Sequence, residues 1–175
     1  MDLFEVIKKR RSIRSYLEKP VEDEKLQAIL ESANAAPSAG DLQAYEIVVI
    51  KSAKQKEALV KAVPRQKFIA EAPVVLVILA NQKRSSERYG ERGVKMYSIQ
   101  DPTIAVSYMQ LAATALGLAT CWVGAFSDSA VAPVIGADIS KGLIPVAILP
   151  IGYPNQSPNV APRRMLSDLV HNERL

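Results

Sequence analysis

The sequence predicts a fold of mixed helices and strands, in which helices pack on a sheet. Two helical patterns precede the first strand pattern, and the run Pro73–Ala80 is apolar on both faces, as a fully buried central strand would be. No internal repeat or linker divides the 175 residues, so we expect one domain over residues 1–175. A doubly wound Rossmann fold is the structural rival. Neither GxGxxG nor GxxxxGK occurs, so we expect no dinucleotide or nucleoside triphosphate binding by those two routes.

The expected helices are marked by apolar residues at helical spacing and by their end signals. Asp2 followed by Glu5 resembles a capping box, and the short helix that starts there leads into a basic run. The pair Asp101–Pro102 supplies an N-cap and an N1 proline to a helix that is apolar nearly all round and ends at Gly117. The other expected helices are Glu22–Ala35, Ser52–Val63 and a short one from Ser127–Asp128 toward Ile135.

The strands expected besides Pro73–Ala80 are Tyr45–Ile50, Thr120–Phe126 and Leu143–Ile151. The segment Arg84–Tyr97 is polar, contains glycine and has no clear period, which predicts a surface loop or short helix. It is the one candidate lid. Beyond Pro154 the chain is proline-rich, and we expect it to be extended as far as Arg164.

The composition excludes several classes of site. Cys121 is the single cysteine, which excludes a disulfide framework and a cysteine-based zinc or iron-sulfur site within one chain. The single histidine, His171, leaves almost no material for a His-rich metal centre or a Ser-His-Asp arrangement. We therefore expect no bound metal, and neither a hydrolase nor a metalloenzyme.

The net charge of +4 suggests a nucleic-acid partner at first sight, because a basic domain gains affinity by releasing counterions. The basic residues form separate short groups without interleaved aromatic residues, and none occurs from Met96 to Ser140. We expect no nucleic-acid binding.

The amphipathic N-terminus does not resemble a signal peptide, and the longest apolar run is too short to span a bilayer, so a cytoplasmic protein without membrane contact is expected.

Four segments have residues that suit a ligand site. The run Arg10-Arg11-Ser12-Ile13-Arg14 leaves a helix with guanidinium groups and a hydroxyl that suit a phosphate, although a solvated basic surface is the alternative. The pair Arg163–Arg164 has the same two interpretations. Pro37–Gln43 could place backbone groups against the edge of a planar ligand, or be an ordinary helix-to-strand connection. Gly124, in a segment that could equally be core, would allow close approach to a ligand.

The order of these motifs resembles the FMN-dependent nitroreductase family. The resemblance rests on four features that span Arg10 to Arg164: RRSIR after a short helix, APSAGDLQ before the first strand, LGLATCWVGAF after a buried helix, and IGYP with a later PRR. It implies a three-layer α-β-α sandwich of the α+β class with a mixed, largely antiparallel central sheet. It also implies a homodimer with an FMN at each of two interface sites.

The same resemblance implies roles for individual residues. Arg10 and Ser12 would lie toward the FMN phosphate and Arg14 toward the ribityl chain or the N1/O2 edge, with Arg11 in the same motif. Arg163 and Arg164 match the C-terminal phosphate position, without showing which of the two points inward. A cation fixed near N1 would stabilise the reduced flavin.

Other motifs would meet the isoalloxazine ring. The backbone of Pro37, Ser38 and Ala39, together with Asp41, would reach the ring from the partner subunit, and Val123 and Gly124 would present backbone toward N5 and O4.

The sequence also departs from the family pattern. The family commonly has Asn at position 41, so Asp41 would have to accept from N3–H, and its charge would oppose reduction; Ala44–Tyr45 replaces the usual Pro-Trp. Gln66 is the candidate for a ribityl contact, and Tyr89 and Tyr97 could line the substrate face or simply pack.

The expected activity is a ping-pong transfer of hydride from NADH or NADPH, through FMN, to an electron-poor acceptor such as a nitroaromatic or a quinone. No protein nucleophile is needed, because the cofactor carries the chemistry. Three alternatives stay open at this point: reductive dehalogenation, flavin fragmentation, and a flavin- or anion-binding module without efficient turnover.

Overall fold

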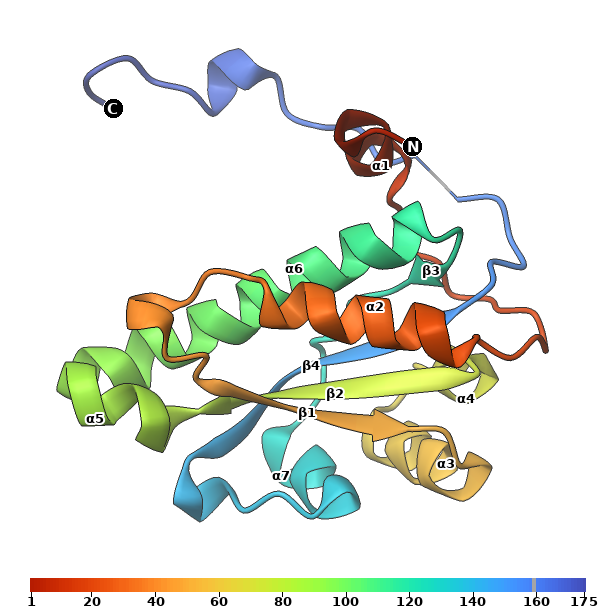
Figure 1. Cartoon of the computed structure of the whole chain (residues 1–175), viewed down its shortest axis with the longest axis horizontal. Helices are drawn as coiled ribbons and strands as arrows, with labels where there is room; N and C mark the ends of the chain where they lie inside the picture. The colour runs from red at the N-terminus through yellow and green to blue at the C-terminus, as the bar shows by residue number, and fades with distance from the viewer. Residues whose placement is uncertain (159) are drawn as a thin grey trace.

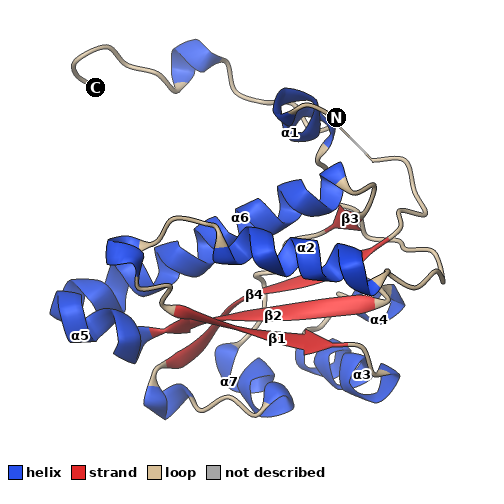
Figure 2. Cartoon of the chain, in the orientation of Figure 1, coloured by secondary structure: helices blue, strands red, loops and turns tan. Residues whose placement is uncertain are grey.

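A computed structural model describes residues 1–158 and 160–175 as three stacked layers (Figures 1 and 2). Helices α2 (Asp23–Asn34) and α6 (Ser98–Ala115) cover one face of a central sheet. Helices α3 (Ala53–Ala62), α4 (Phe68–Glu71) and α7 (Asp128–Val131) lie on the other face. The predicted α-β-α sandwich of the α+β class is confirmed.

The sheet contains four strands in the order β1-β2-β4-β3. These are β1 (Tyr45–Ile50), β2 (Val74–Asn81), β4 (Leu143–Gly152) and β3 (Ala119–Thr120). All three strand pairings are antiparallel, and the parallel component is an isolated bridge between Ser12 and Thr120.

Strand β2 shows why the molecule has two cores. Its side chains alternate between the two faces of the sheet, as the twofold period of a strand requires. One face carries Val74, Leu76 and Ile78, and these pack with Ile29 and Met109 of the covering helices. The other face carries Val75, Val77 and Leu79 and packs against the opposite helical layer. The prediction of a strand buried on both faces is confirmed.

Local signals set most of the boundaries. The Asp2 side chain accepts the Glu5 N–H at 2.9 Å and caps α1 (Leu3–Lys9), and the Ser52 hydroxyl caps α3 by accepting from Gln55 at 3.3 Å. The remaining elements are α5 (Gln82–Arg92), the π-helix η2 (Gly93–Tyr97), and the short 3-10 turns η1 (Ala39–Asp41), η3 (Ala132–Ile135), η4 (Ile139–Lys141) and η5 (Leu166–Asp168).

The segment Arg84–Tyr97 is helical rather than a loop. Asn81 caps α5 by accepting the Arg84 N–H at 3.0 Å, and the polar residues of α5 suit a helix with one solvated face. Gly90 interrupts the helical backbone with φ of 54°. A regular helical period of apolar residues is therefore not expected across the whole segment.

The start expected for α6 at Asp101–Pro102 is wrong. The helix begins at Ser98 and continues directly from the π-helix η2, so Pro102 lies inside it. Asp101 therefore does not cap its own helix. Its carboxylate instead accepts backbone N–H groups of a distant turn, as described below.

The strand expected over Thr120–Phe126 is also shorter than predicted. Strand β3 ends at Thr120, because the chain then leaves the edge of β4 and returns to it only at Val123, which forms an isolated bridge with Ile148.

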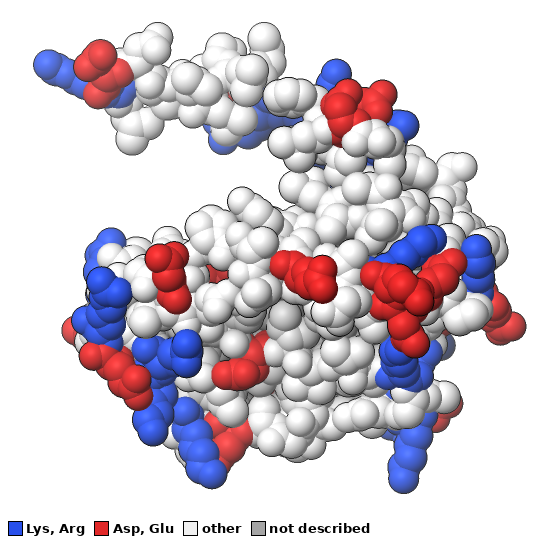
Figure 3. Space-filling model, viewed as in Figure 1, with Lys and Arg blue, Asp and Glu red and all other residues white. Residues whose placement is uncertain are grey.

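The two ends of the chain lie outside the three layers. Figure 3 shows the C-terminal segment standing off the body, with an open recess between it and the layer that contains α6. Helix α1 lies at the base of this segment (Figure 1). Among the described residues, no helix is both long and apolar enough to cross a membrane.

Candidate functional site

The two basic motifs from opposite ends of the sequence meet in one pocket of about 330 Å³. Most of its lining comes from the exit of α1, and the rest from the segment that follows β4. The lining residues are Arg10, Arg11, Ser12, Arg14, Gln156, Ala161 and Arg163.

The backbone that leaves α1 is held in place by the sheet. Arg10 ends the helix, and its N–H still donates to Val6 at 2.8 Å. The N–H of Ile13 then donates to the carbonyl of Thr120 in β3 at 3.0 Å, and the buried Tyr16 hydroxyl donates back to the Ile13 carbonyl at 2.7 Å. The basic run is therefore an extended segment fixed along β3, with its charged side chains directed to the pocket.

The chain after β4 fixes the same segment from its other side. The N–H of Asn155 donates to the Ser15 carbonyl at 3.0 Å, and the side-chain carbonyl of Gln156 accepts the Arg14 N–H at 3.1 Å. The sequence does not point to Gln156, because a lone glutamine in a proline-rich stretch carries no signal.

The pocket is strongly cationic, and none of the described residues that line it is acidic. Burial lowers the pKa of the Arg10 guanidinium, and the neighbouring charges of Arg11 and Arg163 lower it further. Guanidinium groups that line one pocket repel one another. An anion with several oxygen atoms would relieve the repulsion and accept charge-assisted hydrogen bonds.

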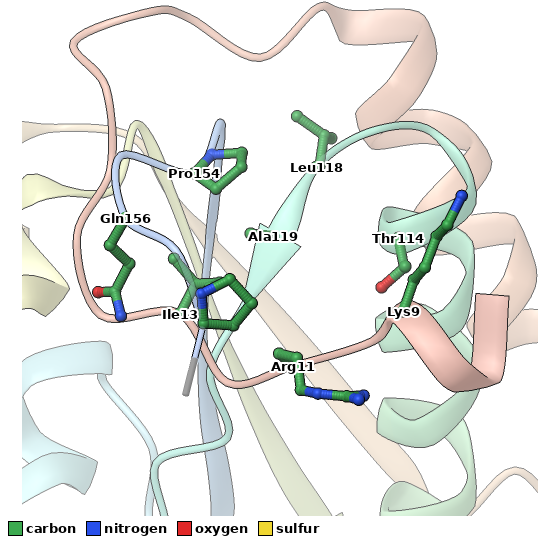
Figure 4. A pocket seen from close by; sticks show the side chains of 9 residues that line it. Lys9, Arg11, Ile13, Thr114, Leu118, Ala119, Pro154 and Gln156 are labelled. Carbon is green, nitrogen blue, oxygen red and sulfur yellow. The ribbon is translucent and has the colours of Figure 1, made fainter. Parts of the chain in front are cut away.

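Neighbouring arginines in the two basic motifs make different contacts. Arg163 lines the pocket, whereas Arg164 donates to the backbone carbonyl of Asp168. Arg11 donates to the carbonyls of Lys8 and Arg10, so its guanidinium is partly occupied by backbone. It also lines a smaller neighbouring pocket of about 150 Å³, where Figure 4 shows it with Lys9 and Thr114.

The Pro37–Gln43 segment forms a second pocket of about 540 Å³, whose lining shares no residue with the basic one. Pro37, Ser38 and Asp41 line it, together with Tyr108 of α6. Figure 1 shows the Pro37–Gln43 turn beside the start of α6 and the basic run beside its C-terminal end, so one chain does not bring its two motifs together.

The turn in this segment has an unusual backbone. Gly40, Asp41 and Gln43 all have positive φ values, of 56°, 56° and 48°. The Ser38 hydroxyl accepts the Gln43 N–H at 2.9 Å, and Arg88 of α5 donates to the Gly40 carbonyl at 3.1 Å. Helix α5 therefore holds this turn.

The tyrosines of the expected lid pack against each other, and Tyr89 also lies beside this turn. The rings of Tyr89 and Tyr97 meet edge to face with centroids 4.9 Å apart, and Arg92 donates to the Tyr97 hydroxyl at 2.8 Å. A Cβ atom added at Gly40 would lie 2.5 Å from the Tyr89 hydroxyl, so only glycine fits without a shift.

Three further predicted site residues differ in how accessible they are to a ligand. Both backbone groups of Val123 bond to Ile148 at 2.9 Å, so its backbone is already used by the sheet. Gly124 is exposed and is the better placed of the two to meet a ligand. Gln66 lies just before α4, on the opposite side of the sheet from α6, and is not among the residues that line the basic pocket.

Comparison with known proteins agrees with this architecture. The chain is 33% identical over 173 residues to the NADH dehydrogenase of Thermus thermophilus, and the match covers 83% of each chain. It is 28% identical to the FMN reductase [NAD(P)H] of Bacillus subtilis, over 97% of this chain and 74% of that one. The solved structure of an FMN-dependent nitroreductase from Clostridium difficile superimposes with a TM-score of 0.80 at 30% identity, covering 97% of this chain and 98% of the other.

A protein-family model also matches the chain. The model of the nitroreductase family matches residues 7–66 and 58–153, which include the basic run, the Pro37–Gln43 turn and all four strands. On this evidence the chain belongs to the nitroreductase family.

Proposed function

We propose that the protein is a cytoplasmic FMN-dependent oxidoreductase, whose single domain over residues 1–175 acts as one half of a homodimer. It passes hydride equivalents from NADH or NADPH to an electron-poor acceptor, such as a nitroaromatic or a quinone, by a ping-pong cycle. The observation that carries the proposal is the convergence of Arg10, Arg14 and Arg163 on one pocket, with no acidic residue among its described lining, in a member of this family.

The residues of this pocket fit the phosphate of FMN. Arginine forms paired charge-assisted hydrogen bonds to phosphate oxygens, and Ser12 adds a neutral donor. When bound, FMN supplies hydride acceptance and donation at its ring, so the protein needs no nucleophile of its own. The protein binds the phosphate, orients the ring and adjusts the charge around it.

The separation of the two motifs supports a dimer. The basic pocket and the Pro37–Gln43 turn lie near opposite ends of α6, and a twofold pairing of two chains would bring the turn of one to the pocket of the other. Helix α1 and the C-terminal segment also present large apolar side chains to solvent, which a partner would cover. These are Leu3, Phe4, Ile7, Val160, Met165, Leu166, Leu169 and Val170.

Three residues would then determine how the ring is held. Arg14 would place a cation toward the edge of the ring that becomes negative on reduction, which stabilises the reduced form. The exposed backbone of Gly124 would meet the N5 side. Asp41 of the partner would accept from N3–H, and its carboxylate would offset part of the effect of Arg14.

The first test is the visible spectrum of the purified protein, before and after anaerobic mixing with NADH and with NADPH. A yellow protein that is bleached by either nucleotide and recovers its colour with an added quinone or nitroaromatic supports the proposal. A colourless protein that takes up no added FMN contradicts it. Bound flavin that neither nucleotide reduces would indicate a binding module without turnover.

A double variant tests the phosphate assignment. Arg10→Ala with Arg163→Ala removes charge-assisted hydrogen bonds worth about 1.5–3 kcal/mol each, so the protein should purify without stoichiometric FMN. Lys141→Ala is the control, because it removes a surface cation that pairs with Asp138. If the double variant retained stoichiometric flavin, the phosphate site would lie elsewhere.

A further inference from the structure

We infer that Asp101 is a positioning residue for the flavin ring, although it is not among the residues that line either of the two pockets described above. Its carboxylate holds the turn that, under the proposed function, reaches the ring bound to the partner subunit. The inference rests on that proposed function and adds to it a residue of the α6 layer.

The carboxylate of Asp101 joins α6 to both ends of the turn. Its Oδ1 atom accepts the N–H of Ala39 at 2.9 Å, and its Oδ2 atom accepts the N–H of Ala44 at 3.2 Å. The residue is 2% exposed, and Ala44 is fully buried. Each oxygen of one buried side chain thus has its own backbone donor, at either end of a turn more than fifty residues away in the sequence.

The turn between these two donors has an unfavourable backbone conformation, which the hydrogen bonds to Asp101 help to hold. Gly40, Asp41 and Gln43 lie in the left-handed region, and two of the three have a side chain. A residue with a side chain is unfavourable in that region and stays there only where surrounding contacts determine its conformation. Arg88 and the Ser38 hydroxyl each hold one point of the turn, whereas Asp101 fixes its two ends.

Asp101 itself is held rigidly by its position in α6. The helix is packed in the core through Ala105, Val106 and Met109, all of which are fully buried. A carboxylate on such a helix is a fixed reference for the turn. The backbone of Ala39 and the side chain of Asp41 are then in place before FMN binds, so binding does not have to order them.

The experiment compares the full-length wild type with Asp101→Asn and Asp101→Glu. The Asn variant keeps the volume, but its amide places a donor against one of the two backbone donors. The Glu variant keeps the charge and both acceptors on a longer stem. Leu59→Ala serves as the control, because it opens a cavity in the core on the opposite side of the sheet and lowers stability without touching the turn.

Four quantities are measured: the dissociation constant for FMN, the visible circular dichroism of bound FMN, amide hydrogen exchange in the FMN-free protein, and the urea midpoint. For Asp101→Asn we expect FMN affinity to fall by about tenfold to one-hundredfold, since one charge-assisted bond is replaced by a donor-donor conflict. Exchange should accelerate at Ala39 and Ala44, and the circular dichroism of the bound flavin should change. Asp101→Glu should recover part of each effect, while Leu59→Ala should lower the urea midpoint and leave FMN affinity as in the wild type.

Three outcomes decide against the inference. If wild type binds FMN and both Asp101 variants match its affinity and flavin spectrum, only the role of Asp101 is overturned. If Leu59→Ala loses as much FMN affinity as Asp101→Asn at the same loss of stability, the effect is general destabilisation. If wild type takes up no FMN, the proposed function fails first. Should Asp101→Asn not fold, Asp101→Glu must show the same direction of change in FMN affinity and in amide exchange.

Discussion

The side-chain carbonyl of Gln156 accepts the backbone N–H of Arg14 at 3.1 Å, which joins residues 142 positions apart. This bond lies beside the basic pocket that both residues line. Through this bond, the proline-rich segment after β4 holds the backbone of the basic run in place. Changing the acceptor at position 156 should therefore alter the affinity of the pocket for FMN.

Gln156→Ala should lower FMN affinity moderately, because the lost bond is worth about 0.5–1.5 kcal/mol. Gln156→Glu keeps an acceptor for Arg14 but adds a negative charge to the pocket, so it should lower FMN affinity more than alanine does. The extra loss should shrink as salt is raised, since the repulsion between exposed charges is screened. Titration of FMN-free protein at two salt concentrations measures both effects. Equal affinities for the two variants at low salt would contradict the placement of Gln156 beside the phosphate.

Arg163 and Arg164 should differ sharply although they are neighbours. Arg163 lines the pocket, whereas Arg164 donates to the Asp168 carbonyl within the C-terminal segment. Arg163→Ala should weaken FMN binding by about 1.5–3 kcal/mol, as expected for loss of a charge-assisted bond. Arg164→Ala should cause a smaller loss of FMN affinity, because it removes only a hydrogen bond to η5. The same FMN titration compares them, and a larger effect at Arg164 would reverse the assignment.

Gly40 and Gly117 form a matched pair for testing the turn. Both have positive φ, of 56° and 76°, so replacement by alanine strains either backbone by roughly 1 kcal/mol. A Cβ atom at Gly117 meets nothing within 4 Å, whereas at Gly40 it lies 2.5 Å from the Tyr89 hydroxyl and 2.6 Å from Arg88. Gly40→Ala should therefore displace α5 side chains and weaken FMN binding, while Gly117→Ala should only lower the urea midpoint. Similar FMN affinities for the two variants would show that contact between the turn and α5 is unimportant.

Much of the fold follows from local patterns. The strand Tyr45–Ile50 is found exactly as expected, and α2 is found within one residue at each end, because the turn signals that bound these segments are adjacent to them in sequence. The buried strand β2 is recognisable because a run that is apolar on both faces fits only the middle of a three-layer structure.

The structure differs from the prediction where distant contacts override a local signal. Asp101–Pro102 has the composition of a helix start, but the preceding π-helix carries the chain into α6 and leaves the carboxylate for Ala39 and Ala44. The basic run could be proposed as an anion site from its residue types. The choice of Arg163 over Arg164, and the part played by Gln156, depend on how the C-terminal segment returns to β3, which no local pattern encodes.

The acid stability of the protein should depend on Tyr153. Its hydroxyl donates to the Glu22 carboxylate at 2.7 and 2.8 Å, and Lys25 donates to the same hydroxyl at 2.7 Å. The hydrogen bond from Tyr153 is the main cause that lowers the pKa of Glu22 to about 2, from an ordinary value of 4.5. These contacts connect the start of α2 to the chain that follows β4.

The direction of the pH effect follows from the lowered pKa. A carboxyl group whose pKa is lower in the folded protein contributes stability that is fully present above its unfolded pKa and is lost as the pH falls through its folded pKa. Tyr153→Phe should therefore lower the free energy of unfolding at pH 6, and its difference from wild type should shrink between about pH 4.5 and pH 2. Urea unfolding of both proteins across that range measures the difference. The lowered pKa of Asp23, which pairs with Lys51, is common to both proteins and cancels. A difference that stayed constant across this range would mean that Tyr153 acts through packing rather than through Glu22.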